Sequence, residues 1–112
     1  MRGTFVDDYN VTNRIAEDTW HQLPGERYHI VSWQLEAGFL IAQNDTSNTA
    51  DGGLWTRIDW VRLNDMEPYT WAYCLSAYDA PSAAAAESTR VAQPDTPRTG
   101  CNGFPYSRMR RP

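Results

Sequence analysis

Arg57 and Asp59 are the residues of this sequence whose types and spacing come closest to a binding chemistry. They lie two positions apart in GLWTRIDW, so in a β-strand they share one face with Trp55. A guanidinium beside a carboxylate and an indole could form a polar floor that orients a small ligand, if that face lines a cup. If the face is exposed, the same residues form a surface ion pair worth under about 1 kcal/mol. The surface or structural interpretation is preferred. The opposite face of the strand is the better core face, and it carries Leu54, Thr56, Ile58 and Trp60.

Three other residues join this candidate ligand site. His29 and Trp33 fall on one face of an expected strand at 28–36. A single His in a strand is more often a hydrogen-bonded structural residue than an acid–base catalyst. Tyr73 belongs to an aromatic stripe that either stacks on a flat or sugar-like ligand or fills the core, and core filling is preferred. The stripe consists of Tyr69, Trp71, Tyr73 and Leu75. The candidate ligand-binding residues are therefore Trp33, Trp55, Arg57, Asp59, Tyr73 and His29.

The sequence contains no motif for catalysis or for metal binding. It has no G-x-S-x-G nucleophile elbow, no H-x-H or H-E-x-x-H pair and no Cys/His cluster. Asp45, Asn48 and Asp51 offer oxygen ligands in a polar loop, but their spacing does not match a calcium-binding EF-hand loop. We therefore predict no catalytic residue, no metal and no cofactor.

The composition is that of a small acidic domain rich in aromatic residues. The chain has 112 residues, of which 41% are apolar, with five Trp, six Tyr and three Phe. This length predicts one domain, residues 1–112, and the aromatic content is typical of a β-sheet core or of a ligand-facing surface. The formal charge of −4 argues against a nucleic-acid partner, which requires a basic field. No apolar stretch approaches the length of a membrane-spanning segment.

The alternation of apolar and polar residues predicts a mainly all-β fold. Strands are expected at 4–9, 11–22 (with a bend near Glu17-Asp18), 28–36, 39–44, 54–63, 69–78 and 104–109. One short Ala-rich helix is expected near residues 80–89, followed by an irregular C-terminal segment. A small antiparallel barrel of six to eight strands, closed by the N-terminal and C-terminal strands, would leave no exposed edge. A two-sheet sandwich is the alternative.

The two cysteines, Cys74 and Cys101, bear on the compartment of the protein. A disulfide between them would tie the irregular segment to a strand, contribute about 4 kcal/mol by loop closure and indicate an extracellular or periplasmic protein. Two free thiols, acting as small buried hydrophobes, would instead indicate the cytoplasm. The disulfide is preferred. Strand-like sequence begins at Thr4, so Met1 is either a true start or an added initiator on a mature exported domain.

Four segments together resemble a group of small exported bacterial domains of uncharacterised function, often lipoprotein-like. These segments are YHIVSW…FLIAQND, GLWTRIDW, YCLSAYDAPSAAAAE and TGCNGFPYS, and the resemblance covers most of the chain after Asp7. It implies a compact calycin-like barrel, export and one Cys74–Cys101 bridge. It transfers no catalytic residue, and this chain differs in showing neither a leader nor a lipid-attachment cysteine.

Three functions follow from these observations, in order of preference. The first is a non-enzymatic exported domain that holds a small ligand or a protein partner at the open end of a barrel. The second is a self-associating structural subunit of an extracellular filament or surface layer, in which extended ends add strands to a neighbour. The third is a small barrel enzyme of the cyclase or isomerase type, which would leave no sequence signature.

Overall fold

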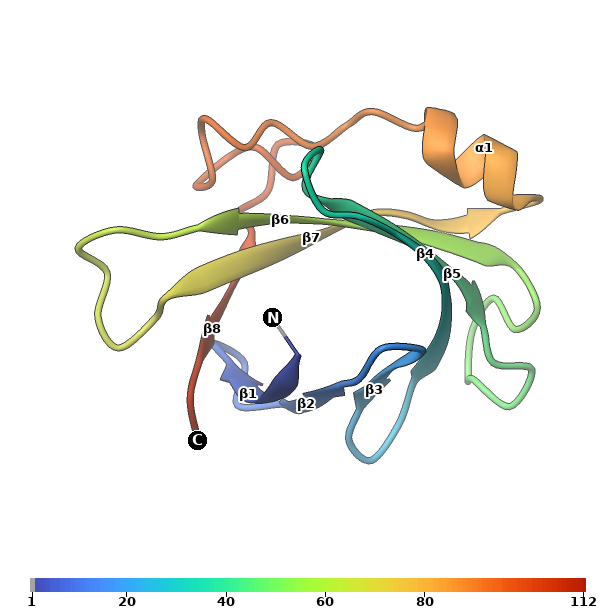
Figure 1. Cartoon of the computed structure of the whole chain (residues 1–112), viewed down its shortest axis with the longest axis horizontal. Helices are drawn as coiled ribbons and strands as arrows, with labels where there is room; N and C mark the ends of the chain where they lie inside the picture. Colours follow the sequence, from blue (N-terminus) through green and yellow to red (C-terminus); the bar gives the residue numbers. More distant parts are fainter. Residues whose placement is uncertain (1) are drawn as a thin grey trace.

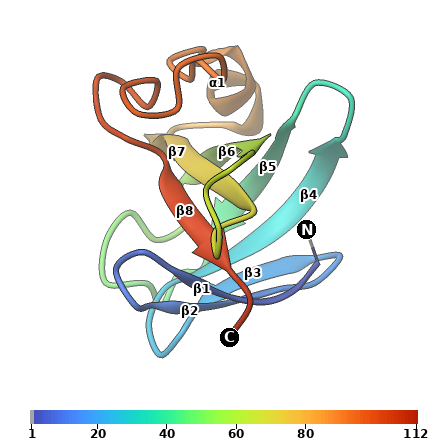
Figure 2. The same ribbon diagram turned by 90° about the vertical axis from the view of Figure 1, so that its left-hand side faces the viewer.

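The computed structural model describes residues 2–112 and forms a closed antiparallel β-barrel (Figures 1 and 2). Its elements are β1 (Gly3–Asp7), β2 (Thr12–Ile15), β3 (Thr19–Gln22), β4 (Arg27–Gln34), β5 (Phe39–Asn44), β6 (Trp55–Arg62), β7 (Trp71–Ala80), α1 (Ala83–Ser88) and β8 (Ser107–Arg110). Each strand pairs with the next along the chain, and β1 pairs with β8 through Val6↔Arg110 and Asp7↔Met109. The predicted barrel, its closing strands and its short helix are confirmed.

The expected single strand at 11–22 is wrong, because this segment forms the two strands β2 and β3. The backbone N–H of Ala16 donates to the carbonyl of Thr19 at 2.8 Å, which closes a tight turn around Glu17 and Asp18. The two strands then pair, with Ile15 opposite Trp20. The exposed polar dipeptide Glu17-Asp18 forms a turn here rather than a bend within one strand. The barrel consequently has eight strands instead of the seven expected.

The lumen of the barrel is filled with side chains. The core cluster inside it contains Phe5, Ile15, Trp20, Tyr28, Ile30, Leu40, Ala42, Ile58, Trp71, Tyr73 and Met109. Aromatic rings meet edge to face at the centre, with 5.1 Å between the centroids of Trp20 and Tyr73 and 5.1 Å between those of Phe5 and Trp71. Trp71 and Tyr73 of the aromatic stripe therefore fill the core, and Leu75 packs against it, as preferred from the sequence. Tyr69 lies before β7 and outside this core, with the guanidinium of Arg108 4.5 Å from its ring centroid.

A buried polar network crosses one part of this core. Trp20 Nε1 donates to Asn13 Oδ1 at 2.9 Å, and Asn13 Nδ2 donates to Asp7 Oδ2 at 3.3 Å. The hydroxyl of Tyr73 lies 3.5 Å from Asp7 Oδ2 and accepts a hydrogen bond from Gln22 Nε2 at 3.1 Å. These polar groups satisfy one another inside the barrel wall, so the network fixes the packing of β1, β2, β3 and β7.

A second layer covers the outer face of β5, β6 and β7 (Figure 1). Helix α1 packs there through Ala86 against Phe39 and Ile41, with Trp55 at the edge. The irregular segment 89–106 covers the neighbouring part, where Tyr106 packs against Ala72 and Cys74. Strands buried on both faces carry apolar residues in nearly continuous runs, as in FLIAQN of β5. The outer face of β1–β4 has no such cover and carries partly or fully exposed side chains.

The predicted disulfide is confirmed. Cys74 of β7 bonds to Cys101 of the covering segment, with 5.6 Å between their Cα atoms. Cys74 is buried and belongs to the same cluster as Tyr106. The bridge thus fastens the irregular segment to the barrel wall. This segment has few large apolar side chains that could otherwise hold it there.

Candidate functional site

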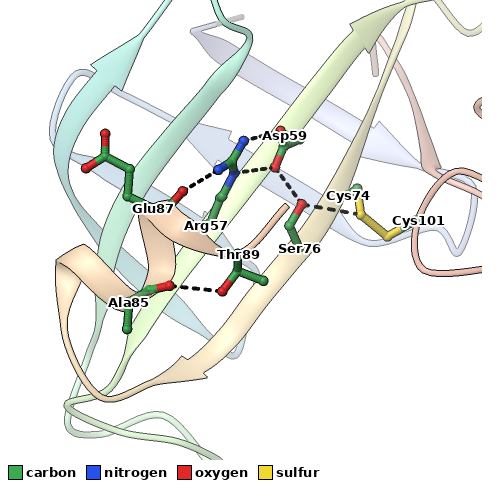
Figure 3. Close-up of polar contacts among 8 residues, drawn as sticks. All are labelled: Arg57, Asp59, Cys74, Ser76, Ala85, Glu87, Thr89 and Cys101. Atoms are coloured by element: carbon green, nitrogen blue, oxygen red, sulfur yellow. Dashed lines mark hydrogen bonds and ion pairs between the residues drawn. A yellow bond between two sulfur atoms is a disulfide. The ribbon is translucent and has the colours of Figure 1, made fainter. Parts of the chain in front are cut away.

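Arg57 and Asp59 form a buried ion pair on the outer wall of the barrel (Figure 3). Arg57 donates to both carboxylate oxygens of Asp59, from Nε at 2.9 Å and from Nη2 at 3.1 Å. Its Nη1 donates to the backbone carbonyl of Glu87 at 2.6 Å, and its guanidinium lies 3.8 Å from the ring centroid of Phe39. Ser76 Oγ donates to Asp59 at 2.5 Å.

This pair is neither the floor of the lumen nor an exposed surface pair. Arg57 and Asp59 are each only 8% exposed, because α1 and the covering segment lie over them. Ile58, on the opposite face of β6, points into the lumen, as predicted from the sequence. The ion pair therefore links β6, β7 and α1, which is a structural role.

His29 and Trp33 do not share a face, contrary to the sequence prediction. A β-bulge between Ile30 and Ser32 shifts the register of β4, so the alternation reverses beyond it. Trp33 consequently turns inward and packs on the lumen core, where its ring centroid lies 5.8 Å from that of Trp60. His29 stays on the exposed outer face.

His29 has a local partner there. Its Nε2 lies 2.7 Å from Asp45 Oδ2. Hydrogen bonds from Ser47, first from its hydroxyl and then from its backbone N–H, together with the contact to His29, hold the pKa of Asp45 well below its usual range. The geometry is that of an exposed structural pair, and His29 lies at the edge of a shallow depression on the outer face.

The six candidate residues therefore lie in three separate places. Trp33 and Tyr73 belong to the lumen, whereas Trp55 lies with Arg57 and Asp59 on the covered outer face. His29 lies on the uncovered outer face. Burial, reinforced by the charge of Asp7, raises the pKa of the Tyr73 hydroxyl, so this group is a neutral member of the polar network.

A cavity of about 800 Å³ opens at one rim of the barrel, and we call it the rim cup. It lies where the turn between β4 and β5 meets the end of β6, and its lining includes Phe5, Leu35, Trp60, Arg62, Trp71 and Arg111. The guanidinium of Arg111 lies 4.8 Å from the ring centroid of Phe5. The rim cup thus combines aromatic walls with two arginines, and two acidic residues, Glu36 and the ion-paired Asp59, also border it.

A second cavity, of about 610 Å³, lies on the outer side of the same rim, and we call it the proline groove. Its lining includes Leu63, Met66, Pro94, Pro97, Pro105 and Tyr106. Residues 61–64 at the end of β6 border both cavities, as do Pro94 and Tyr106. The two cavities therefore flank one strand end.

The buried polar atoms that lack a hydrogen-bond partner gather at this rim. Within residues 2–112 they are Asp8 Oδ1, Trp71 Nε1 and Tyr106 OH. Trp71 borders the rim cup, Asp8 borders the proline groove, and Tyr106 borders both. Burial, with a smaller contribution from the charge of Asp59, raises the pKa of Tyr106 to about 12. Unpaired buried polar groups are costly, and all three lie beside the two cavities.

Sequence reasoning missed most of the rim residues. Trp60 and Trp71 fall at predicted core positions, and no sequence pattern singles out Arg111. The one available signal was the alternation of β6, which continues from Ile58 through Trp60 to Arg62 and so brings a cation to the open end of the lumen.

Among the described residues, no group of three or more His, Cys, Asp or Glu side chains is placed to hold a metal ion. The helix found in residues 2–112 is too short to cross a membrane. Comparisons with family models, with curated proteins and with solved structures find no match to this chain.

Proposed function

We propose that this chain is a non-enzymatic exported domain that binds a small molecule at the open rim of its barrel. The observation that supports this most strongly is the rim cup, in which the indoles of Trp60 and Trp71 stand beside two arginines. Its volume of about 800 Å³ lies within the range of small-molecule sites, and such sites combine apolar walls with a few polar groups.

The lining suggests the chemistry of the ligand. Flat apolar groups stack on indole rings, and Arg62 and Arg111 can pair with a carboxylate or a similar anion. Trp71 is largely buried at the base of the cup, and its indole N–H has no protein partner. We therefore propose an aromatic or otherwise flat organic anion, held at the rim because the lumen below is filled.

The disulfide supports export. Structural disulfides persist in oxidising compartments, so we propose an extracellular or periplasmic location. This proposal agrees with the exported calycin-like domains that the sequence resembles.

The test is quenching of Trp fluorescence by a panel of aromatic carboxylates, their neutral amides and simple sugars. We expect carboxylates to bind with Kd values below about 1 mM and the matched amides to bind at least about tenfold more weakly. The double variant Arg62→Gln/Arg111→Gln should lose this preference, while the control Arg14→Gln/Arg27→Gln, on uncovered strands, should keep it. No quenching by any compound, or equal binding of acids and amides, would refute the proposal.

The assembly subunit and the small barrel enzyme stay predictions without a supporting contact. The cheapest measurement that separates the first of them from a binding domain is light scattering at rising protein concentration. Growth of the scattering mass with concentration would favour assembly.

A further inference from the structure

The uncovered outer face of the barrel carries a row of four polar side chains, two of which are arginines and one a histidine. Register pairing places Thr4 opposite Arg14, Arg14 opposite His21, and His21 opposite Arg27. These four residues, which we call the basic row, come from β1, β2, β3 and β4 in that order. Directly paired residues on neighbouring strands place their side chains on the same face of the sheet.

The strand alternation turns the whole row outward. The chain neighbour of each member, namely Phe5, Ile15, Trp20 and Tyr28, is buried in the lumen core. Arg14 and Arg27 are exposed, and His21 and Thr4 are partly exposed. The row borders a shallow depression of about 450 Å³, which Thr19 and His29 also line.

Two arginines flank a histidine within the row. Arg27 Nη2 lies 3.4 Å from His21 Nδ1, and His21 stands directly between the two arginines in the sheet. The chain as a whole carries a charge of −4, so such an arrangement is not a consequence of its composition.

Two acids near this face, Asp45 and Glu26, have other partners, whereas Glu17 and Asp18 lie in the exposed turn between β2 and β3 beside it. Asp45 accepts hydrogen bonds from Ser47 and contacts His29, which lies two residues after Arg27 in β4. Glu26, which precedes Arg27, accepts hydrogen bonds from the backbone N–H and the hydroxyl of Thr49. No salt bridge involves Arg14 or Arg27 in the part of the chain that the structure describes. The positive charge of the row is therefore available to a partner.

We propose that the basic row is a docking site for an acidic polysaccharide. Three strand intervals of about 4.8 Å make the row about 14 Å long, which suits a linear polymer with an anionic group on successive sugars. Arginines pair with carboxylates or sulfates, and the Thr hydroxyls can bond to sugar hydroxyls. A nucleic acid fits less well, because the row has no Phe, Tyr or Trp side chain on which a base could stack and the whole chain is acidic.

The test measures binding of the whole protein to immobilised alginate and dextran sulfate by biolayer interferometry, with neutral dextran and double-stranded DNA beside them. The double variant Arg14→Gln/Arg27→Gln should bind either acidic polysaccharide about 30-fold more weakly at low salt. Thr4→Glu, which adds an opposing charge to the same row, should also weaken binding. Arg62→Gln/Arg111→Gln removes the same charge from the rim cup and should leave binding unchanged.

Several results would overturn this proposal. They are failure of the wild-type protein to bind either acidic polysaccharide, equal binding by the basic-row variant, equal binding to neutral dextran, and tighter binding to DNA than to alginate. The substituted side chains are surface residues, so thermal unfolding should confirm that each variant is folded. Because the basic row and the rim cup share no residue, either site can fail without the other.

Discussion

Asp59 and Cys74 stand directly opposite each other in the ladder between β6 and β7. The carboxylate of the buried ion pair and the anchoring sulfur of the disulfide are thus neighbours on one covered face. Ser76 joins them, since its hydroxyl donates to Asp59 and lies 3.7 Å from Cys74 Sγ. The non-covalent hold on α1 and the covalent hold on the covering segment therefore meet at one place.

Removing the carboxylate at this place should destabilise the protein strongly. Asp59→Ala leaves the buried Arg57 guanidinium without its counter-ion, and the free energy of unfolding should fall by about 3–5 kcal/mol. Urea denaturation measures this loss. The double variant Arg57→Met/Asp59→Leu should recover most of it, since well-packed apolar residues replace buried ion pairs at little cost. A loss below about 1 kcal/mol for Asp59→Ala would contradict the buried position of the pair.

Breaking the disulfide should loosen the covering segment first. Cys101→Ser opens a link between residues 27 apart, and we expect a loss of about 3–4 kcal/mol and a melting temperature lower by several degrees. Limited proteolysis should cut within residues 89–106 before it cuts the barrel. Thiol titration of the denatured, unreduced wild-type protein provides the control, and two reactive thiols would show that the bridge is absent.

A single methyl group at Gly100 should disturb the same segment. A Cβ built there would lie 2.1 Å from the backbone oxygen of Gln93 and 2.6 Å from that of Thr96, so the chain must move apart beside Cys101. Gly100→Ala should cost at least about 1–3 kcal/mol. Gly25→Ala is the matched control, because its Cβ would meet nothing closer than 3.9 Å. Similar unfolding midpoints for the two variants would disprove the close approach.

Alkaline pH should destabilise the fold through its buried tyrosines. Burial, followed by the charges of Glu26 and Asp51, raises the pKa of Tyr28 from 10.0 to about 12, and burial also raises the pKa values of Tyr73 and Tyr106. Between pH 10 and 12 the unfolded chain therefore binds fewer protons than the folded chain. Stability should be constant below pH 10 and then fall, by about 2–3 kcal/mol for Tyr28 alone.

Two measurements check this prediction. The tyrosinate absorbance at pH 11 should show at least three of the six tyrosines still protonated in the folded protein. Urea denaturation at pH 9 and pH 11.5 should show the loss of stability, and Tyr28→Phe should make it smaller. Equal stability at both pH values would be the contrary result.

The sequence predicted the barrel because each strand of the uncovered half buries only one face. In β4, for example, Tyr28 and Ile30 alternate cleanly with exposed neighbours. The prediction failed at the turn around Glu17 and Asp18, which contains neither Gly nor Pro. It failed again at the bulge after Ile30. One extra residue there reverses the side of the sheet to which each later side chain of β4 points, and the local sequence pattern does not reveal it.

The candidate site was less predictable for a different reason. The burial of Arg57 depends on a carbonyl 30 residues away and on a covering segment without any periodicity. The rim cup brings Phe5 from the first strand together with Trp60 and Arg111 from distant parts of the chain. Neither arrangement is local in sequence, so residue spacing alone could identify the participating types but not their meeting place.

The pairing of β1 with β8 also determines when this protein can fold. Val6 and Arg110 are paired across the closing strands although 104 sequence positions (110 − 6) separate them. Nearly all of residues 2–112 must therefore have left the ribosome before the barrel can close. Until then the apolar residues of β5 and β7 lack both their lumen neighbours and their outer cover. The nascent chain should consequently depend on chaperones that shield hydrophobic strands, and it should refold slowly compared with helical proteins of the same length.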